Sequence, residues 1–233
     1  MRDILVTGTD TGIGKTMVAA ALVKALRDAG LRAVGFKPVE TGVVDDEEAD
    51  SRLLTRASGE EVSLTTPLLA LREPLAPAVA AERAGVQIPF GDIERRLGAL
   101  RGAGCAIVVE GAGGVTVPLL WKTAVGDPYT ALDLAERCGL DAIVVGRAGL
   151  GTLNHMVMTV TMLRMRRIPV KALILNGGTG ADDLAEATNP AILARLVPAV
   201  PIVSIPQHPA SVDPVAASVG YLSTFVSAHT GAA

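Results

Sequence analysis

The stretch Gly8-Thr9-Asp10-Thr11-Gly12-Ile13-Gly14-Lys15-Thr16, or GTDTGIGKT, decides the fold of this 233-residue chain. It ends with the Gly-Lys-Thr of a phosphate-binding P-loop, although five residues rather than the usual four separate Gly8 from Gly14. The short apolar run Ile4-Leu5-Val6 precedes it, and apolar residues at helical spacing follow it over residues 16–29. A strand, a glycine-rich loop and a helix in this order form a phosphate site, because the loop and the helix N-terminus direct backbone N–H groups at the anion.

The same alternation of short apolar runs and helical patterns continues along the chain. Such a pattern is typical of a parallel sheet whose crossover helices cover both faces. We therefore expect one α/β domain over residues 1–233, with a mostly parallel central β-sheet, helices on both faces and the P-loop NTPase fold. Residues 59–91, rich in Ala and Pro, are expected to be the least regular part, a lobe or insertion near the site. Further strands are expected at 33–36, 106–109, 142–145, 170–175 and 202–205, and helices at 49–57, 92–100 with Asp92 as N-cap, and 152–166.

Composition and charge narrow the classes of function. Hydrophobic residues make up 49% of the chain and charged residues 19%, which is enough apolar material for a large core. The net charge of −3 and the aromatic content of 3% argue against a nucleic-acid partner, which needs a basic face or stacking rings. We also expect no membrane partner, because no uncharged apolar run reaches the length of a spanning helix.

The two cysteines bear on the compartment. Cys105 and Cys138 are expected to be free thiols in the core rather than a disulfide. The chain enters its first strand at once and carries no signal-peptide pattern. These features predict a cytoplasmic protein.

Charged residues follow the expected strands, where ligands of a parallel sheet bind. Lys15 would reach the outer phosphates of a nucleotide, and the Thr16 hydroxyl would bind Mg²⁺. Lys37 follows the second strand, and its compact ammonium could stabilise a transferring phosphoryl group. Glu110 follows the third strand, where P-loop proteins carry a metal carboxylate. One carboxylate of the acidic segment 45–50 could complete the metal site, since Mg²⁺ beside phosphates takes one or two protein carboxylates.

Two later segments also carry polar groups at this edge. The glycine loop at 149–151 opens a helix, so it could be either an anion site or a simple helix start. His155 could be a general base, or a histidine hydrogen-bonded at that helix start. Asn176 ends a strand, and its amide has both the donor and the acceptor that pair with a purine edge.

Together, five stretches resemble dethiobiotin synthetase, the ATP-dependent family of biotin biosynthesis. They are GTDTGIGKT at 8–16, FKPVETG at 36–42, VEGAGG at 109–114, GLGTLNH at 149–155 and ILNG at 174–177. They occur in the family's order, and the family's P-loop has the same five-residue spacing. The resemblance implies a ligase that carboxylates 7,8-diaminononanoate with CO₂ and closes the ring. In this reaction a carbamate is phosphorylated by ATP, and the second amine attacks the carbamic-phosphoric anhydride and releases phosphate.

The resemblance also implies roles for individual residues. Lys15, Lys37 and Thr11 would act on the carbamate and the transferring phosphoryl group, and Mg²⁺ would be held by Thr16, Asp50 and Glu110, with Glu48 as an alternative to Asp50. The substrate would contact Thr41 and, for its carboxylate, Leu150, Gly151, Thr152, Leu153 and Asn154. The nucleotide would contact Gly12, Ile13, Gly14, Lys15, Thr16, Met17, Asp50, Glu110, Gly111, Ala112, Gly113, Asn176, Gly177, Pro206, Gln207 and His208, with Asp213 as a further candidate.

The resemblance also bears on quaternary structure, and two alternative functions stand beside it. In the family the loop corresponding to 150–154 comes from the neighbouring subunit, so the resemblance implies a homodimer with shared sites. One alternative is the ATP-binding part of a cobyrinate-type amide synthetase, which is normally fused to a glutamine-hydrolysing domain. The other is a P-loop ATPase switch like the chromosome-partitioning ATPases, which usually carry a second lysine where this chain has Thr9 and Asp10.

Overall fold

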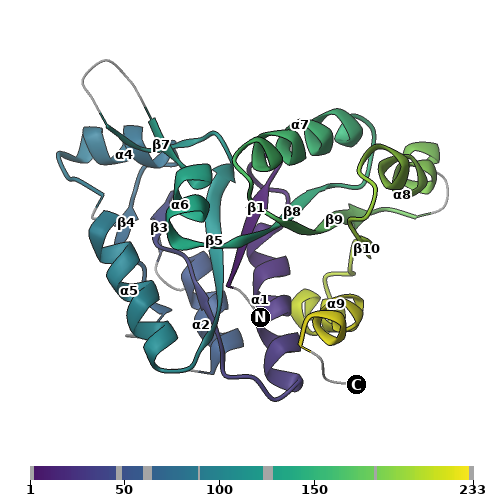
Figure 1. Ribbon diagram of the computed structural model, residues 1–233, viewed down its shortest axis with the longest axis horizontal. Coiled ribbons are helices and arrows are strands. Elements are labelled where there is room, and N and C mark those ends of the chain that lie inside the picture. Colours follow the sequence, from purple (N-terminus) through teal and green to yellow (C-terminus); the bar gives the residue numbers. More distant parts are fainter. Residues whose placement is uncertain are drawn as a thin grey trace.

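A six-stranded sheet forms the centre of the computed structural model, which describes residues 3–45, 49–59, 65–88, 90–122, 128–180 and 183–230 (Figure 1). All neighbouring strands of this sheet pair in parallel, in the order β10-β9-β8-β1-β5-β2. The strands are β1 (Ile4–Gly8), β2 (Ala33–Phe36), β5 (Ala106–Gly114), β8 (Asp141–Arg147), β9 (Val170–Gly178) and β10 (Ile202–Pro206). The expectation of a mostly parallel α/β sheet is confirmed.

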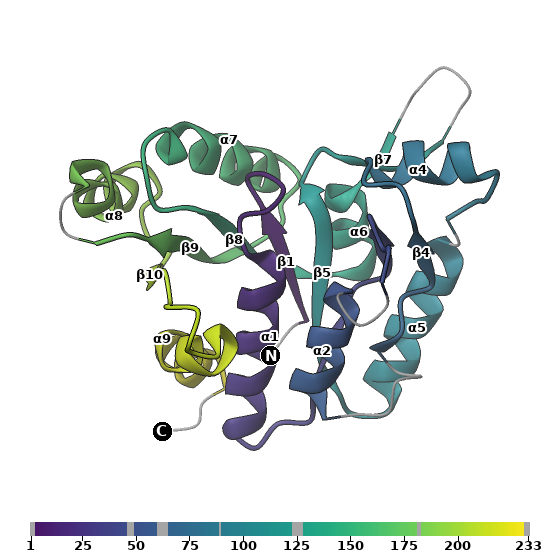
Figure 2. The ribbon, with the colours of Figure 1, turned by 180° about the vertical axis from the view of Figure 1, so that it is seen from behind.

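Side chains that alternate along β1 separate the core into two layers. Ile4 and Val6 belong to one cluster, with residues of α1 (Lys15–Asp28), α2 (Asp50–Ser58) and α9 (Pro214–Thr230). Leu5 belongs to the other cluster, with residues of α5 (Phe90–Gly102), α6 (Ala131–Cys138), α7 (Thr152–Met165) and α8 (Leu184–Leu196). Figures 1 and 2 show these two sets of helices on opposite sides of the sheet. Helices therefore cover both faces, as expected.

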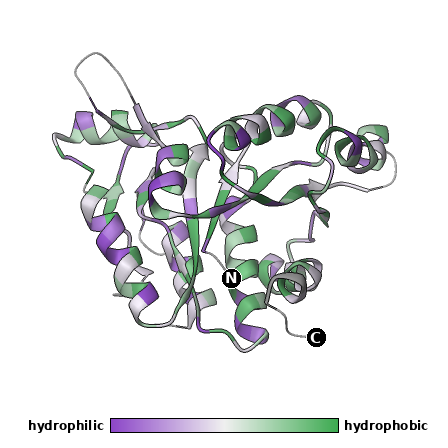
Figure 3. Ribbon diagram, viewed as in Figure 1, coloured by the Kyte–Doolittle hydropathy of each residue, from purple (hydrophilic) through white to green (hydrophobic). Residues whose placement is uncertain are grey.

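Helix α1 is the most enclosed of these helices. It packs between the sheet and helices α2 and α9, and residues from Val18 to Leu26 are mostly buried. Helix α5 buries only Ile93, Leu97 and Leu100, and its other side is hydrophilic (Figure 3). The phosphate-binding loop at the start of α1 is thus attached to the most deeply packed strand-helix unit.

Strand β1 also marks the point where the sheet's strand order reverses. On one side of β1 lie β5 and then β2, and on its other side lies β8. The early strand β2 is therefore on the opposite side of β1 from the later strand β8. Ligands of open parallel sheets bind at such a switch point, beyond the carboxyl ends of the strands. The loop that follows Gly8 lies there.

Residues 59–91 are more regular than we expected. The described part contains β4 (Leu69–Leu71), which pairs in parallel with β3 (Val39–Thr41), and α4 (Pro77–Ala84). Alanine favours helix, and Pro77 occupies the first turn of α4, where its missing N–H costs nothing. A second small sheet pairs β6 (Pro118–Trp121) with β7 (Pro128–Thr130) beside α4. The Ala and Pro content therefore marks a helix in the described part of this segment, and residues 74–77 lie near the site, as expected.

Several element ends differ from the expectation. Strand β5 continues beyond Val109 to Gly114 because its backbone stays paired with β1, where Gly8 lies opposite Gly114. Glu110 therefore lies inside a strand rather than after it. Strand β9 likewise extends past Asn176 to Gly178. Asp92 is inside the first turn of α5, where it bonds Arg95, and it is not the N-cap.

Two findings bear on the earlier expectations. Cys105 and Cys138 are buried free thiols, as expected. No helix within the described ranges combines the length and hydropathy needed to cross a membrane.

Candidate active site

The loop between β1 and α1 leaves the first N–H groups of the helix open. Gly12 and Gly14 have φ values of 70° and 88°, in the left-handed region that favours glycine. Gly14 is the N-cap of α1 and provides no side chain to bond the free N–H groups. A side chain at Gly14 would lie 2.2 Å from Asn176 Nδ2. Glycine is thus required here by both conformation and space.

Lys15 folds back over this loop. Its side chain is buried, and Nζ donates a 2.7 Å hydrogen bond to the carbonyl of Asp10. The Asp10 carboxylate accepts a 2.7 Å bond from the Thr11 N–H and lies 3.4 Å from Arg147 at the end of β8. Burial lowers the pKa of Lys15, and the nearby Glu110 opposes this shift. The ammonium is held at the mouth of the loop, where an outer phosphate would arrive.

A buried charge cluster lies next to the loop. Lys37 directly follows β2, and its Nζ lies 2.9 Å from Glu110 Oε1 and also bonds the Asp50 carboxylate. Glu110 Oε1 accepts a 2.9 Å bond from the Thr16 hydroxyl as well. Strands β2 and β5 are neighbours in the sheet, and this pairing brings Lys37 and Glu110 together. The cluster joins two strands, the start of α2 and the P-loop.

The protonation of this cluster follows from burial and charge. Burial alone lowers the pKa of Lys37, but the charges and hydrogen bonds of Glu110 and Asp50 outweigh it and raise the pKa above its ordinary value. Complete burial raises the pKa of Glu110, and Lys37 opposes that rise. The lysine therefore keeps its proton and stays a cation between two carboxyl groups.

The same cluster has the donor set for Mg²⁺. Glu110 Oε2 is buried and has no hydrogen-bond partner among the described residues. An orphaned buried carboxylate oxygen beside a threonine hydroxyl and a second carboxylate fits a hard cation with oxygen ligands. The described ranges contain no group of three or more acidic, histidine or cysteine side chains that could hold a metal ion. Mg²⁺ beside phosphates needs only one or two carboxylates, so Thr16, Asp50 and Glu110 suffice. Glu48, the alternative to Asp50, lies outside the described residues.

A cavity of about 720 Å³ opens over the P-loop and this cluster. Most of the residues expected to perform chemistry line it, although the sequence separates them by up to a hundred positions. They are Thr11, Gly12, Gly14, Lys15, Thr16, Met17, Lys37, Thr41, Asp50, Glu110, Ala112 and Gly113.

The residues expected around a nucleotide base do not line this cavity, and of them Asn176 contacts the P-loop. Asn176 Nδ2 donates a 2.9 Å bond to the carbonyl of Ile13. Pro206 lies on the neighbouring strand β10, and the Gln207 N–H bonds Gly178. His208 bonds Ser218. Asp213 bonds the N–H groups that begin α9, which gives this carboxylate a structural role.

The expected carboxylate site at the start of α7 also lies outside this cavity. Gly151 is the N-cap with φ 91° and provides no side-chain cap, although the N–H of Thr152, the first residue of α7, bonds the carbonyl of Gly149 at 3.4 Å. Leu150 is 94% exposed, and the Thr152 hydroxyl is buried without a partner among the described residues. His155 is exposed on α7. Within one chain Leu150, Gly151 and Asn154 are therefore exposed, whereas Thr152 is buried.

Sequence reasoning missed one wall of the cavity. These residues are apolar and come from α2, from the segment before α4 and from the turn after β5. The pairing of Thr41 with Leu71 in the β3–β4 sheet brings this segment close, and no short motif signals it. The wall is formed by Leu53, Pro74, Leu75, Ala76, Pro77 and Val117.

Comparison with known proteins distinguishes the dethiobiotin synthetase hypothesis from the amide synthetase and the ATPase switch. A family model described as an AAA domain matches residues 2–215. The ATP-dependent dethiobiotin synthetase BioD of Anaeromyxobacter dehalogenans (strain 2CP-C) is 43% identical over 211 residues, which is 90% of this chain and 92% of the relative. The chain belongs to the dethiobiotin synthetase family. BioD of Mycobacterium leprae (strain Br4923) is 39% identical over 85% of this chain and 84% of its own length. BioD of Aquifex aeolicus is 37% identical over 83% and 84%, respectively.

Solved structures extend the comparison to the fold. The MinD cell division protein of Aquifex aeolicus has a TM-score of 0.55 at 14% identity, covering 99% of this chain and 98% of its own. A ParA family ATPase of Chlorobium tepidum has a TM-score of 0.53 at 13% identity, covering 97% of each chain. At such identities the likeness concerns the fold alone, and it confirms the P-loop NTPase fold. The dethiobiotin synthetase relatives favour neither the ATPase switch nor the amide synthetase.

Proposed function

We propose that the protein is an ATP-dependent dethiobiotin synthetase that converts 7,8-diaminononanoate, CO₂ and ATP to dethiobiotin, ADP and phosphate. One amine of the substrate takes up CO₂ as a carbamate. A carbamate oxygen attacks the γ-phosphorus of ATP and displaces ADP. The second amine then attacks the carbonyl carbon of the anhydride, expels phosphate and closes the five-membered urea ring. The cavity that unites Lys15, Lys37 and Glu110 is the observation that carries this proposal.

The P-loop and the two lysines serve the phosphoryl transfer. The free N–H groups at the start of α1 bind the ATP phosphates, and Lys15 leaves the Asp10 carbonyl to reach them. Lys37 enters the cavity from the end of β2 and stabilises the charge shared by carbamate and phosphoryl oxygens. Thr11, in the middle of the loop, also lines the cavity and would lie close to the reacting carbamate. Because little covalent chemistry falls to the protein, positioning and charge stabilisation supply the catalysis.

Thr16, Asp50 and Glu110 would hold Mg²⁺. The ion would neutralise charge on the ATP phosphates as they react. Lys37 bridges the two carboxylates. Binding of the metal would free its ammonium to turn toward the phosphoryl group.

The substrate's shape matches the cavity. Its hydrocarbon chain would lie on the apolar wall that includes Leu75 and Val117, while Thr41 would hydrogen-bond its polar end at the reacting side. The Asn176 amide donates one hydrogen bond to the Ile13 carbonyl, and its remaining donor and acceptor would hydrogen-bond adenine. Residues 206–208 would line the other side of the base.

We further propose a homodimer in the cytoplasm. The start of α7 has no side-chain cap and does not line its own chain's cavity, so the segment 150–154 of a second subunit could bind the substrate's carboxylate. The buried free thiols Cys105 and Cys138 suit a reducing compartment.

The test is phosphate release from purified protein given Mg-ATP, bicarbonate and 7,8-diaminononanoate. We expect release that requires both the diamine and bicarbonate, with dethiobiotin detected by mass spectrometry. Release that is independent of the diamine would instead support an ATPase switch and overturn the proposal. A matched reaction with 7-aminononanoate, which lacks the second amine, should form no ring.

A further inference from the structure

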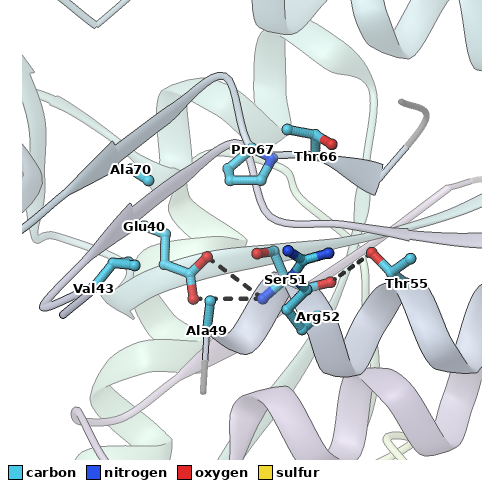
Figure 4. Close-up of a pocket in the computed structure, with 9 residues that line it drawn as sticks. All are labelled: Glu40, Val43, Ala49, Ser51, Arg52, Thr55, Thr66, Pro67 and Ala70. Atoms are coloured by element: carbon cyan, nitrogen blue, oxygen red, sulfur yellow. Dashed lines mark hydrogen bonds between the residues drawn. The ribbon is translucent and has the colours of Figure 1, made fainter. Parts of the chain in front are cut away.

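Helix α2 begins without a cap of its own. Its N-cap residue is Ala49, which has no side-chain hydrogen bond to offer. The carboxylate of Glu40 from β3 takes this place: it accepts from the Asp50 N–H, and each of its oxygens lies 3.4 Å from the Ser51 nitrogen. Figure 4 shows the Glu40 side chain pointing at the start of α2, over a pocket of about 230 Å³. Two otherwise open N–H groups are thus satisfied from another element.

The position of Glu40 on its strand explains this contact. Successive residues of a strand point to opposite sides, so Thr41 lines the 720 Å³ cavity while Glu40 faces α2. Glu40 is only 2% exposed. A buried carboxylate is costly unless it is hydrogen-bonded, and the partial positive charge at a helix N-terminus suits it.

The cap has a consequence beyond α2 itself. Asp50 is the first residue of that helix, so the bond that fixes its backbone also fixes where its carboxylate starts. That carboxylate reaches Lys37, which reaches Glu110, which in turn accepts from Thr16 of the P-loop. Glu40 is the outermost member of this chain of hydrogen bonds and does not line the cavity.

We propose that Glu40 is a positioning residue that holds Asp50 where it can bind Mg²⁺; this rests on the metal role proposed for Asp50. Glu40 touches neither substrate nor metal. Replacement of Glu40 would leave the P-loop and Glu110 in place, and Asp50 alone would lose its fixed position in the metal site.

The experiment measures ATP affinity by calorimetry as Mg²⁺ is varied, and again in excess EDTA, without diaminononanoate. Residues that orient a metal ligand typically contribute 10–100-fold to metal affinity, so we expect Glu40→Ala to raise the half-saturating Mg²⁺ concentration about tenfold. ATP affinity in EDTA should stay within about twofold, because the P-loop is untouched. Glu40→Gln keeps one acceptor oxygen and should shift the Mg²⁺ requirement by about threefold. The surface variant Glu82→Ala is the matched control and should change neither value.

A double-mutant cycle separates positioning from a general loss of structure. In an Asp50→Asn background, adding Glu40→Ala should change the Mg²⁺ requirement by less than about twofold, because the ligand it positions is already impaired. An equal shift in both backgrounds would overturn the proposal, as would an unchanged Mg²⁺ requirement in Glu40→Ala. If Glu40→Ala fails to fold, Glu40→Gln is compared in the same cycle. Since no diaminononanoate is present, an enzyme inactive on that substrate would still give a clear result for Glu40.

Discussion

Lys37 Nζ lies 2.9 Å from Glu110 Oε1, and the two buried side chains come from neighbouring parallel strands. The relationship places a cation and a carboxylate on the same edge of the sheet as the P-loop. Both groups are buried and hydrogen-bonded to each other and to neighbouring side chains. Replacement of Lys37 and replacement of Glu110 should affect different properties of the enzyme.

Removing the ammonium should impair turnover and leave nucleotide binding intact. We expect Lys37→Ala to lower kcat by about 10²–10³-fold, the range for loss of one group that stabilises transition-state charge. ATP affinity should change by less than about threefold, because the P-loop N–H groups and Lys15 remain. Phosphate release and calorimetry measure the two effects. Lys24→Ala, on the exposed side of α1, is the control. A fully active Lys37→Ala would remove this residue from the catalytic set.

Removing the carboxylate should act through the metal. Glu110→Ala is expected to raise the Mg²⁺ concentration needed for half-maximal activity by about tenfold or more, because only one carboxylate would remain. Titration of activity with MgCl₂ is the measurement, and Glu110→Gln guards against a cavity effect in the core. The assignment is wrong if both variants keep the wild-type Mg²⁺ requirement.

The P-loop glycine offers a test of the backbone. Gly14→Ala requires a left-handed conformation, which costs a non-glycine residue roughly 1–2 kcal/mol, and its side chain would collide with Asn176. We expect ATP affinity to fall by at least about tenfold. Gly98→Ala in α5 meets nothing within 4 Å and should instead raise the free energy of unfolding by about 0.5–1 kcal/mol. Equal ATP affinity in both variants would mean that the loop conformation is not required for binding.

Asp133 predicts a pH-dependent contribution to stability. Burial alone raises the pKa of Asp133, but hydrogen bonds from Thr130 and Arg166 outweigh it and lower the pKa. A carboxyl group with a lowered pKa stabilises the fold above its unfolded pKa and loses that contribution as pH falls through its folded pKa. Asp133 closes the capping box of α6, so Asp133→Ala should cost about 1 kcal/mol at pH 7. Urea unfolding at pH 7 and pH 3 should show a smaller difference from wild type at pH 3. An equal difference at both pH values contradicts the assignment.

The sequence was most informative where chemistry follows a buried parallel strand. Lys37 and Glu110 could be assigned in advance to the ligand-binding edge, because the carboxyl ends of parallel strands meet there, but their contact depends on β2 and β5 being neighbours, which the sequence did not predict. The end of β5 could not be predicted, because glycines usually signal a loop and the strand reaches Gly114 only through an irregular pairing with Gly8. The cap by Glu40 was also invisible, since it depends on a contact between residues ten positions apart on different elements.

The place of Glu110 inside a nine-residue central strand has a consequence for how the site moves. Amide hydrogens in such a strand exchange with deuterium only when most of the sheet opens, whereas those in the first turn of a short helix exchange through local fraying. Glu110 should thus exchange orders of magnitude more slowly than Asp50, which begins the nine-residue α2. The Glu110 side of the proposed metal site would then open only together with the sheet, whereas the Asp50 side would depend on the bond from the Asp50 N–H to Glu40.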